Sequence, residues 1–435
     1  MKRLVFGASV AAAFALTGCS STAHNTGTPT DTATAAPTPT ATVTPVYLVP
    51  SPTVPADIFD ENYFPEYELI IPPASWNALQ VDPRTYVSAT FRHNGVAITN
   101  IGAKLKGRWG SFRDLERKSA FSLKFDHFVA GQYFHGFDHL TLNNGAQDPS
   151  GVHERTTYLI FRSIGVPAPK CNNCKLYVNG SYWGVMVQLE TVKKQFLTNH
   201  FTDDTGNLYE GDPYDAFLPA LAGGWPPNFG AVQWNLLDDI LPGHESNFTL
   251  HTNTGPNNRS DLTAISGALD AAQPGQLLQA LAPYLDWDEY FRYFAGESLV
   301  GDWDGYNFFI PNNFYLYHQP SDGKFRFMPW GVDQTCVPQP FYMSIRAMVW
   351  SSALTTKVVA DAAAWSAFKQ RLADCLATFL SLNLGPRTNA YVNQIRPAMY
   401  DDKRKDWTNA QFELGAAQVQ NFVYTQPNWI ASNLP

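Results

Sequence analysis

The stretch GDWDGYNFFIPNNFYLYHQPSDGKFRFMPWGVD, residues 301–333, holds the most informative pattern in the chain. Two runs rich in aromatic and aliphatic residues, 314–317 and 324–330, flank a Pro-Ser-Asp-Gly turn sequence, which predicts a β-hairpin. Asp304 precedes this hairpin and Asp333 follows it. Because the two ends of a hairpin meet at one end of a sheet, we expect these two carboxylates to lie close together.

Two asparagines just before the first strand, Asn312 and Asn313, add amide oxygens to the same sheet end. Carboxylate and amide oxygens are hard ligands that suit Mg²⁺ or Mn²⁺ beside phosphate groups. A base Asp, a metal-binding Asn and a metal-binding Asp also follow one another in protein kinases. The alternative is that these residues only cap turns in solvent, since Asp and Asn are common in loops.

Outside this stretch the chain predicts strands first and helices last. Asn-Gly pairs at 94–95 and 179–180 stand between strand-like segments and predict two further hairpins. Residues 211–285 are expected to be a loop-rich insert with one helix over 262–281, and the part after Asp361 is mostly helical in pattern. This order predicts an α+β fold with two lobes, a strand-rich first half and a helical second half.

The first residues predict a secreted protein. Lys2 and Arg3 precede an apolar run that is too short to cross a bilayer but fits a signal peptide over 1–18. The run ends at Cys19, where a lipoprotein signal peptidase would cleave and the thiol would be acylated; an ordinary secretory signal with an incidental cysteine is the alternative. Residues 19–56, mostly Thr, Ala, Pro and Ser, predict a disordered stalk. We therefore expect a lipid-anchored protein of the cell envelope, facing the periplasm or the exterior.

The composition limits the partners. The net charge of −8 argues against nucleic acid, which would need a basic face. Hydrophobic residues make up 45% of the chain, enough for one large core in the part after the stalk. No later apolar run reaches the length of a membrane span, so membrane contact is expected only through the lipid.

Four cysteines remain once Cys19 carries the lipid. In an oxidising compartment we expect two disulfides, Cys171–Cys174 and Cys336–Cys375. The Cys-Asn-Asn-Cys spacing also fits half a zinc site or a redox motif, but the other two cysteines form no second close pair.

Several segments together resemble the CotH kinase family, whose members are secreted, atypical protein kinases. The matching segments stand in the family's order and cover roughly residues 60–336. They are Lys104–Ser111, Lys118–Phe125, Leu142–Arg155, Val178–Glu190, Asn207–Glu210, Trp303–Gly305, Asn313–Tyr317 and Pro329–Asp333. The resemblance implies a kinase domain over 57–435, with an atypical two-lobed protein-kinase-like fold that binds ATP between its halves.

The resemblance also implies roles for single residues. Asp333 would hold Mg²⁺ or Mn²⁺ against the ATP phosphates, with Asn313 as a second ligand on the metal side. Asp304 would orient or deprotonate the acceptor hydroxyl. Lys118, paired with Glu190, would contact the phosphates of the nucleotide.

Three other basic residues enter the same comparison. Arg108 is a further candidate phosphate contact, while Lys106 and Lys124 compete with Lys118 for the place of the phosphate lysine. The acceptor is expected to be a protein serine or threonine, with a glycan or the protein itself as alternatives.

The sequence departs from the family pattern at three positions. Gly331 stands where the family usually has the first Asp of Pro-Trp-Asp-x-Asp, Lys106 replaces an Arg, and Asp302 replaces an Asn. If the missing Asp were essential, the protein would be an inactive pseudokinase that serves as a surface binding protein. Because Asp333 is retained, we expect an active enzyme. A carbohydrate-binding surface protein, suggested by the aromatic content, is the less favoured alternative.

Overall fold

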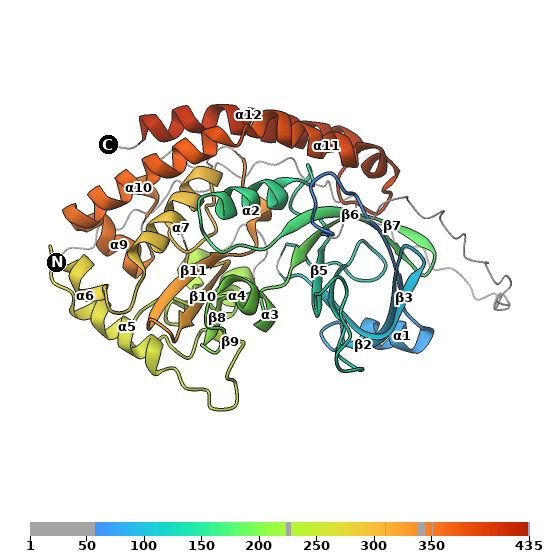
Figure 1. Cartoon of the computed structure of the whole chain (residues 1–435), viewed down its shortest axis with the longest axis horizontal. Helices are drawn as coiled ribbons and strands as arrows, with labels where there is room; N and C mark the ends of the chain where they lie inside the picture. The colour runs from blue at the N-terminus through green and yellow to red at the C-terminus, as the bar shows by residue number, and fades with distance from the viewer. Residues whose placement is uncertain are drawn as a thin grey trace, which may run out of the picture. The chain divides into compact units, whose positions relative to one another are not determined.

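The computed structural model describes residues 57–108, 110–222, 228–308, 310–337, 344–349 and 351–433. The predicted signal peptide, Cys19 and the stalk lie outside these residues. Within the described ranges, no helix combines the length and apolar character needed to cross a membrane. The described part contains both strands and helices, which confirms the predicted α+β class (Figure 1).

Seven strands form a closed barrel in the first part of the domain (Figure 1). They are β1 (Glu66–Ile70), β2 (Val87–His93), β3 (Val96–Lys106), β4 (Ala120–Lys124), β5 (His139–Asn143), β6 (Cys171–Val178) and β7 (Ser181–Glu190), with α1 (Pro73–Val81) after β1. Their order around the barrel is β1-β2-β3-β4-β5-β7-β6, and parallel pairing of β1 with β6 closes it. Alternation along β3 places Leu105 inside the barrel, and its neighbours Lys104 and Lys106 therefore project from the outer face.

The two Asn-Gly hairpins of the barrel are confirmed. Asn94 and Gly95 join β2 to β3 with φ of 49° and 77°, and Asn179 and Gly180 join β6 to β7 with φ of 49° and 78°. Positive φ at both central residues is the backbone of a type I′ turn, which matches the twist of the flanking strands.

A second sheet, in the order β11-β10-β8-β9, belongs to the later part of the chain. Its strands are β8 (Leu208–Gly211), β9 (Thr249–Leu250), β10 (Phe314–Gln319) and β11 (Lys324–Pro329). Antiparallel pairing of β10 with β11, from Phe314 opposite Pro329 to Gln319 opposite Lys324, confirms the hairpin predicted within 301–333.

The remaining elements are mostly helical and dominate the chain after β11. They are α2 (His153–Ser163), α3 (Lys194–His200), α4 (Tyr214–Leu221), η2 (Phe229–Ala231), η3 (Trp234–Leu236), α5 (Ser260–Ala271), α6 (Leu277–Leu281), α7 (Trp287–Val300), η4 (Val332–Gln334), α8 (Ile345–Met348), α9 (Ala353–Ala360), α10 (Ala362–Ser381), α11 (Leu384–Asp401) and α12 (Asn409–Ser432).

The insert differs from its prediction in two ways. Residues 262–281 form parts of two helices, α5 and α6, because Pro274 cannot continue the hydrogen-bond ladder and Gly275 takes φ of 78°. The insert also supplies β9 and α4, so it contributes to the second sheet as well as loops.

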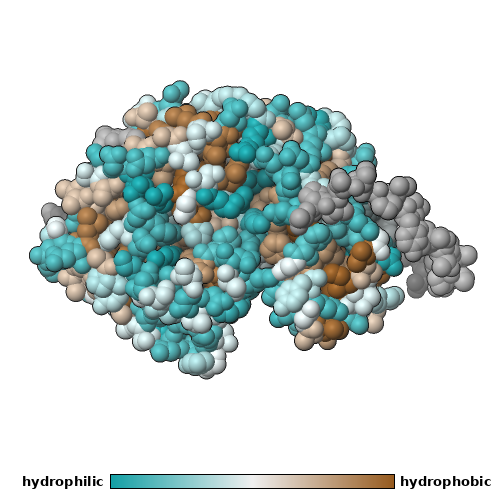
Figure 2. Space-filling model, viewed as in Figure 1, coloured by the Kyte–Doolittle hydropathy of each residue, from teal (hydrophilic) through white to brown (hydrophobic). Residues whose placement is uncertain are grey.

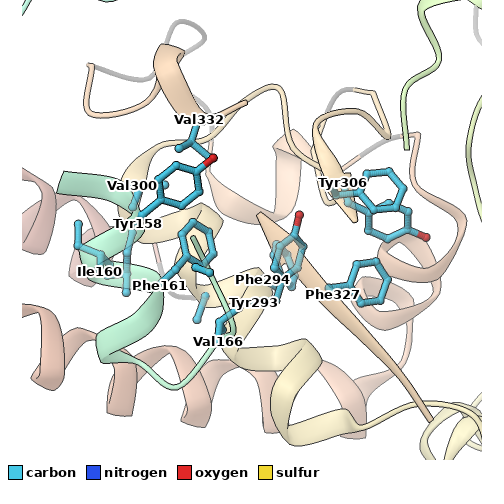
Figure 3. Packing of buried hydrophobic residues seen from close by; sticks show 14 of the residues in the cluster. Tyr158, Ile160, Phe161, Val166, Tyr293, Phe294, Val300, Tyr306, Phe327 and Val332 are labelled. Carbon is cyan, nitrogen blue, oxygen red and sulfur yellow. The ribbon is translucent and has the colours of Figure 1, made fainter. Parts of the chain in front are cut away.

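The main core joins α2, α7 and the second sheet, and it fixes the elements that carry the candidate site. The ring of Phe161 on α2 lies 5.9 Å from that of Tyr293 on α7, which stacks on Phe327 of β11 at 5.2 Å. Figure 3 shows the side chain of Tyr158 on α2 directed toward Val332 of η4. Buried aromatic side chains remove large apolar areas from water, so they hold these elements firmly against one another.

The expected disulfides are wrong, because all four cysteines are buried free thiols. Strand β6 begins at Cys171, so Cys171 and Cys174 stand three positions apart on it. Their side chains therefore point to opposite faces, one into the main core and one into the barrel. The Cys336 thiol lies 3.5 Å from the hydroxyl of Thr157, while Cys375 lies on α10 among other neighbours.

Candidate active site

The loop after α7 presents Asp304 at the start of the second sheet's hairpin. Helix α7 ends at Gly301, which takes the left-handed conformation with φ of 69°. The side-chain amides of Asn312 and Asn313 then donate to the two Asp304 carboxylate oxygens at 3.0 and 2.7 Å. The predicted proximity of Asp304 to both asparagines is confirmed, and the two amides fix the orientation of the carboxylate.

A buried glutamate holds this loop from beneath. The backbone N–H groups of Tyr306 and Asn307 donate to the Glu297 carboxylate at 2.9 and 3.0 Å, and the Asn307 amide donates at 2.7 Å. Burial raises the pKa of Glu297 to about 7, although these hydrogen bonds oppose the shift. Position 305 must be glycine, because a Cβ there would collide with this carboxylate.

Asp333 lies on η4, directly after β11, and is tied to α2 through its backbone. The Nδ1 atom of His153 lies 2.7 Å from the Asp333 carbonyl oxygen, to which it donates. The backbone N–H of His153 donates to the carboxylate of Asp148 at 2.8 Å. Burial and the nearby charge of Asp148 raise the pKa of Asp333 to about 6, while Lys106 acts in the opposite direction.

The charge of Asp333 acts on Asp304, as expected for two carboxylates at one sheet end. Burial raises the pKa of Asp304 to about 7; the charges of Asp333 and Asp212 add to this rise, while the bond from Asn312 opposes it. Carboxylates whose pKa values are raised by burial and by one another form a region of negative potential, which favours a cation.

The lysine that faces these acids is Lys106, at the end of β3. Its ammonium donates to the Asn143 amide oxygen at 2.6 Å, and the Asn143 amide donates to Glu154 on α2 at 2.7 Å. Burial lowers the pKa of Lys106, while the charges of Glu154 and Asp333 oppose that shift. Burial and the charge of Asp333 raise the pKa of Glu154 to about 8. Lys106, Asn143 and Glu154 therefore form a hydrogen-bonded chain beside Asp333.

The predicted pair of Lys118 with Glu190 is wrong. Lys118 instead forms a buried ion pair with Asp402, just after α11, at 2.7 Å. Glu190 lies 3.1 Å from His200 on α3. Lys124 is 3.9 Å from Asp126, the acid two residues along the chain. Neither Lys118 nor Lys124 thus takes the place that the structure gives to Lys106.

Asp304, Asp333 and Asp212 form an acidic cluster, and Arg108 lies at its edge. Its half-exposed guanidinium forms an ion pair with Asp212 at 2.9 Å and lies over the ring of Tyr214. Asp212 is one of the charges that raise the pKa of Asp304, so Arg108 approaches the site from the side of the insert. The outline of the molecule is indented between the barrel and the part that carries the second sheet (Figure 2).

The oxygen atoms fit a divalent cation that is shared with phosphates. In the part of the chain that the structure describes, no three His, Cys, Asp or Glu side chains form a metal-binding group. The site instead offers the Asp333 carboxylate and the amide oxygen of Asn313. Mg²⁺ in proteins is commonly held by one or two carboxylates together with substrate phosphates, so these two oxygen donors could form the protein's part of such a site.

Three residues of the site were given no role by the sequence, namely Glu154, Asn143 and Glu297, and both glutamates are buried. Glu154 and Asn143 matched the family's pattern within the segment Leu142–Arg155, but the sequence assigned them no role. Glu297 stood unmarked in a helix. The packing of α2 and α7 places the two glutamates at the site, and the end of β5 supplies Asn143.

The comparisons with known proteins give one family. The family model described as CotH kinase protein matches residues 103–430. The inner spore coat protein H of Bacillus subtilis (strain 168) is 21% identical over 388 residues, which cover 86% of this chain and 99% of that protein. Spore coat protein homolog 1 of Rhizopus delemar is 23% identical over 264 residues, 57% of this chain and 38% of the relative.

Two weaker likenesses complete the comparison. The invasin CotH7 of Rhizopus delemar is 25% identical over 179 residues, 40% of this chain and 27% of the relative. The crystal structure of the Helicobacter pylori proinflammatory kinase CtkA aligns with 72% of this chain and 92% of that one, at 11% identity and a TM-score of 0.29.

Proposed function

The chain belongs to the CotH kinase protein family, and we propose that it transfers the γ-phosphate of ATP to a hydroxyl acceptor. The proposal rests on one observation. The residues Asp304, Asn313 and Asp333 lie beside the hydrogen-bonded side chains of Lys106, Asn143 and Glu154. Phosphoryl transfer in kinases depends on the same parts: a lysine oriented by a helix glutamate, metal-holding Asp and Asn side chains, and an Asp for the acceptor.

Lys106 would contact the phosphates of ATP. It has a neutral amide, Asn143, as its hydrogen-bond acceptor, so its positive charge is not neutralised by direct contact with a carboxylate. Glu154 would orient the lysine through that amide. Arg108, half-exposed at the edge of the cluster, would be a second phosphate contact after exchanging Asp212 for the nucleotide.

Asp333 and Asn313 would hold Mg²⁺ or Mn²⁺. A cation bound there supplies neutralisation of the charge on the phosphate oxygens. With a pKa of about 6, the Asp333 carboxyl is mostly ionised at neutral pH and available as a ligand. Its backbone bond to His153 fixes η4 against α2, and α2 also carries Glu154.

Asp304 would receive the acceptor hydroxyl. Each of its oxygens already accepts one amide hydrogen, which leaves further lone pairs and a fixed orientation for the hydroxyl. A pKa of about 7 places this carboxyl near the pH at which a base both carries its charge and accepts a proton.

The relatives and the N-terminal sequence support a location at the cell surface. The relatives are spore coat and invasin proteins, and the N-terminal pattern is that of a lipoprotein signal. We infer a secreted protein anchored in the cell envelope by a lipid on Cys19, which modifies serine or threonine hydroxyls of a protein.

The test is metal-dependent transfer from γ-labelled ATP to the protein itself and to a generic acidic protein. Asp304→Ala and Asp333→Ala are compared with Asp322→Ala, a control in the turn of the same hairpin whose carboxylate pairs with Arg326. We expect transfer by the wild type and by Asp322→Ala only. Absence of transfer, together with no ATP-dependent thermal shift in Mg²⁺ or Mn²⁺, would instead indicate a binding scaffold.

A further inference from the structure

Gly331, between β11 and η4, has no room for a side chain. It takes φ of 57°, and a Cβ atom there would lie 2.5 Å from the amide oxygen of Asn313 and 2.7 Å from its Cγ. Real Cβ atoms essentially never approach a neighbour this closely. Gly323 in the β10–β11 turn makes the contrast clear: its φ is 69°, yet a Cβ there would have nothing within 4 Å.

The amide of Asn313 is held in this position by two contacts. Its Nδ2 group donates to Asp304 at 2.7 Å, and its backbone carbonyl accepts from the N–H of Trp330 at 3.1 Å. Because Nδ2 must face the carboxylate, the other end of the amide, Oδ1, faces Gly331. Among the described residues no N–H or O–H group donates to this oxygen, so its lone pairs are available to a ligand.

Gly331 stands two residues before Asp333. Gly331 directly precedes η4, the element that carries Asp333, and a side chain at 331 would need the space that the amide oxygen of Asn313 already fills. Asn313 itself has φ of 51°, a conformation that glycine adopts without strain, so its side chain can be removed without disturbing the backbone.

We propose that Asn313 and residue 331 compete for one ligand position beside Asp333, and that Gly331 assigns it to the neutral amide oxygen of Asn313. The inference rests on the proposed function and concerns how this site takes its cation. With one carboxylate and one amide, the site has too few charged ligands to retain Mg²⁺ or Mn²⁺ alone. The cation therefore enters together with the phosphates of the nucleotide. Gly331 is then a requirement of the site rather than a sign of its loss.

The experiment measures Mn²⁺ binding from the electron paramagnetic resonance signal of free Mn²⁺, with and without a non-hydrolysable ATP analogue. Gly331→Ala is compared with Gly323→Ala, which carries the same left-handed strain in open space. Asn313→Gly and the double variant Gly331→Asp with Asn313→Gly complete the set. Thermal unfolding is recorded for every variant.

We expect the wild type and Gly323→Ala to bind Mn²⁺ with the analogue, and at least tenfold more weakly without it. Gly331→Ala and Asn313→Gly should each weaken binding with the analogue about tenfold or more. The double variant should regain that binding and should also hold Mn²⁺ without nucleotide, because it exchanges an amide for a carboxylate.

Two results would overturn the inference. One is Gly331→Ala binding Mn²⁺ with the analogue as well as Gly323→Ala does; the other is a double variant no better than Asn313→Gly. If the wild type binds no Mn²⁺ with the analogue, the proposed function itself fails. The steric part is then still decided by stability. Gly331→Ala must unfold at a lower temperature than Gly323→Ala, and adding Asn313→Gly to Gly331→Ala must remove that difference.

Discussion

We expect Lys118→Met to lower stability but keep phosphoryl transfer, and Lys106→Met to keep stability but lose transfer. Lys118 is 3% exposed and pairs with Asp402, which is fully buried. Lys118→Met leaves that carboxylate without its counter-ion, and removing one partner of a buried pair costs about 3–5 kcal/mol. Asp402 keeps backbone donors from Val185, Arg404 and Lys405, so the lower end of that range applies.

A loss of about 3 kcal/mol is a large part of the 5–15 kcal/mol that stabilises a typical protein. For a domain of this size we expect the unfolding temperature of Lys118→Met to fall by roughly 3–6 °C. Phosphoryl transfer per folded molecule should persist at temperatures below the transition, because Lys118 does not touch the acidic cluster.

Lys106→Met should behave the other way round. Its partner Asn143 is neutral, and Glu154 has a pKa of about 8, so this carboxyl is largely protonated at pH 7 and no carboxylate loses a directly bonded counter-ion. Stability should change by no more than about 1 kcal/mol, the worth of an ordinary hydrogen bond. Transfer should be lost, because the phosphate lysine is missing.

The measurement pairs thermal unfolding with transfer from labelled ATP for both variants. The exposed lysine Lys170, which pairs with Asp57 on the surface, supplies the control Lys170→Met with little effect on either readout. If Lys118→Met were stable and inactive while Lys106→Met remained active, the sequence-based choice of Lys118 would be right and the placement of Lys106 at the phosphates would be wrong.

Three further results are expected. In the folded protein Asp304, Asp333 and Glu154 have pKa values of about 7, 6 and 8, above their ordinary values near 4, so the folded state binds more protons than the unfolded state. The unfolding temperature of the ligand-free protein should therefore fall as the pH rises from 5 to 8, and Glu154→Gln should make this fall smaller. The buried thiols of Cys171, Cys174, Cys336 and Cys375 should react with a thiol reagent only after denaturation, without any reductant, and fewer than four would contradict the free-thiol assignment. Arg108→Ala should raise the KM for ATP several-fold with an unchanged unfolding temperature, since this half-exposed side chain has only a surface ion pair to lose; an unchanged KM would remove it from the nucleotide site.

What the sequence could predict is local. The Asn-Gly turns specify positive φ at two successive residues, and both barrel hairpins formed as expected. Asp304 and Asn313 lie together because they stand nine positions apart and the hairpin begins directly after Asn313. The errors came from contacts across the fold. Which lysine faces the acids depends on where α2 and the loop after α11 pack, and no pattern in the first strands encodes that placement.

The wrong disulfide prediction also came from structure that the cysteine spacing does not reveal. Spacing and compartment favoured a bond between Cys171 and Cys174, but both residues lie in strand β6, whose alternation puts the two thiols on opposite faces. Burial then raises the pKa of both thiols, which suppresses the thiolate needed for oxidation. The fold therefore prevents the bond geometrically and disfavours the chemistry as well.

The raised pKa values at the site connect stability to ligand binding with opposite signs. Without ligand, Asp304, Asp333 and Glu154 are easier to bury when protonated, so a rise in pH weakens the fold. A cation and Lys106 both prefer the ionised forms, so the same rise in pH strengthens binding of metal and nucleotide. Bound Mg²⁺ with ATP should consequently raise the unfolding temperature most at high pH, where the ligand-free protein is least stable. The ligand-free site holds carboxylates whose charges oppose one another, so it is suited to take a cation together with phosphates. The neutral amide of Asn313, which occupies the space beside Gly331, points the same way.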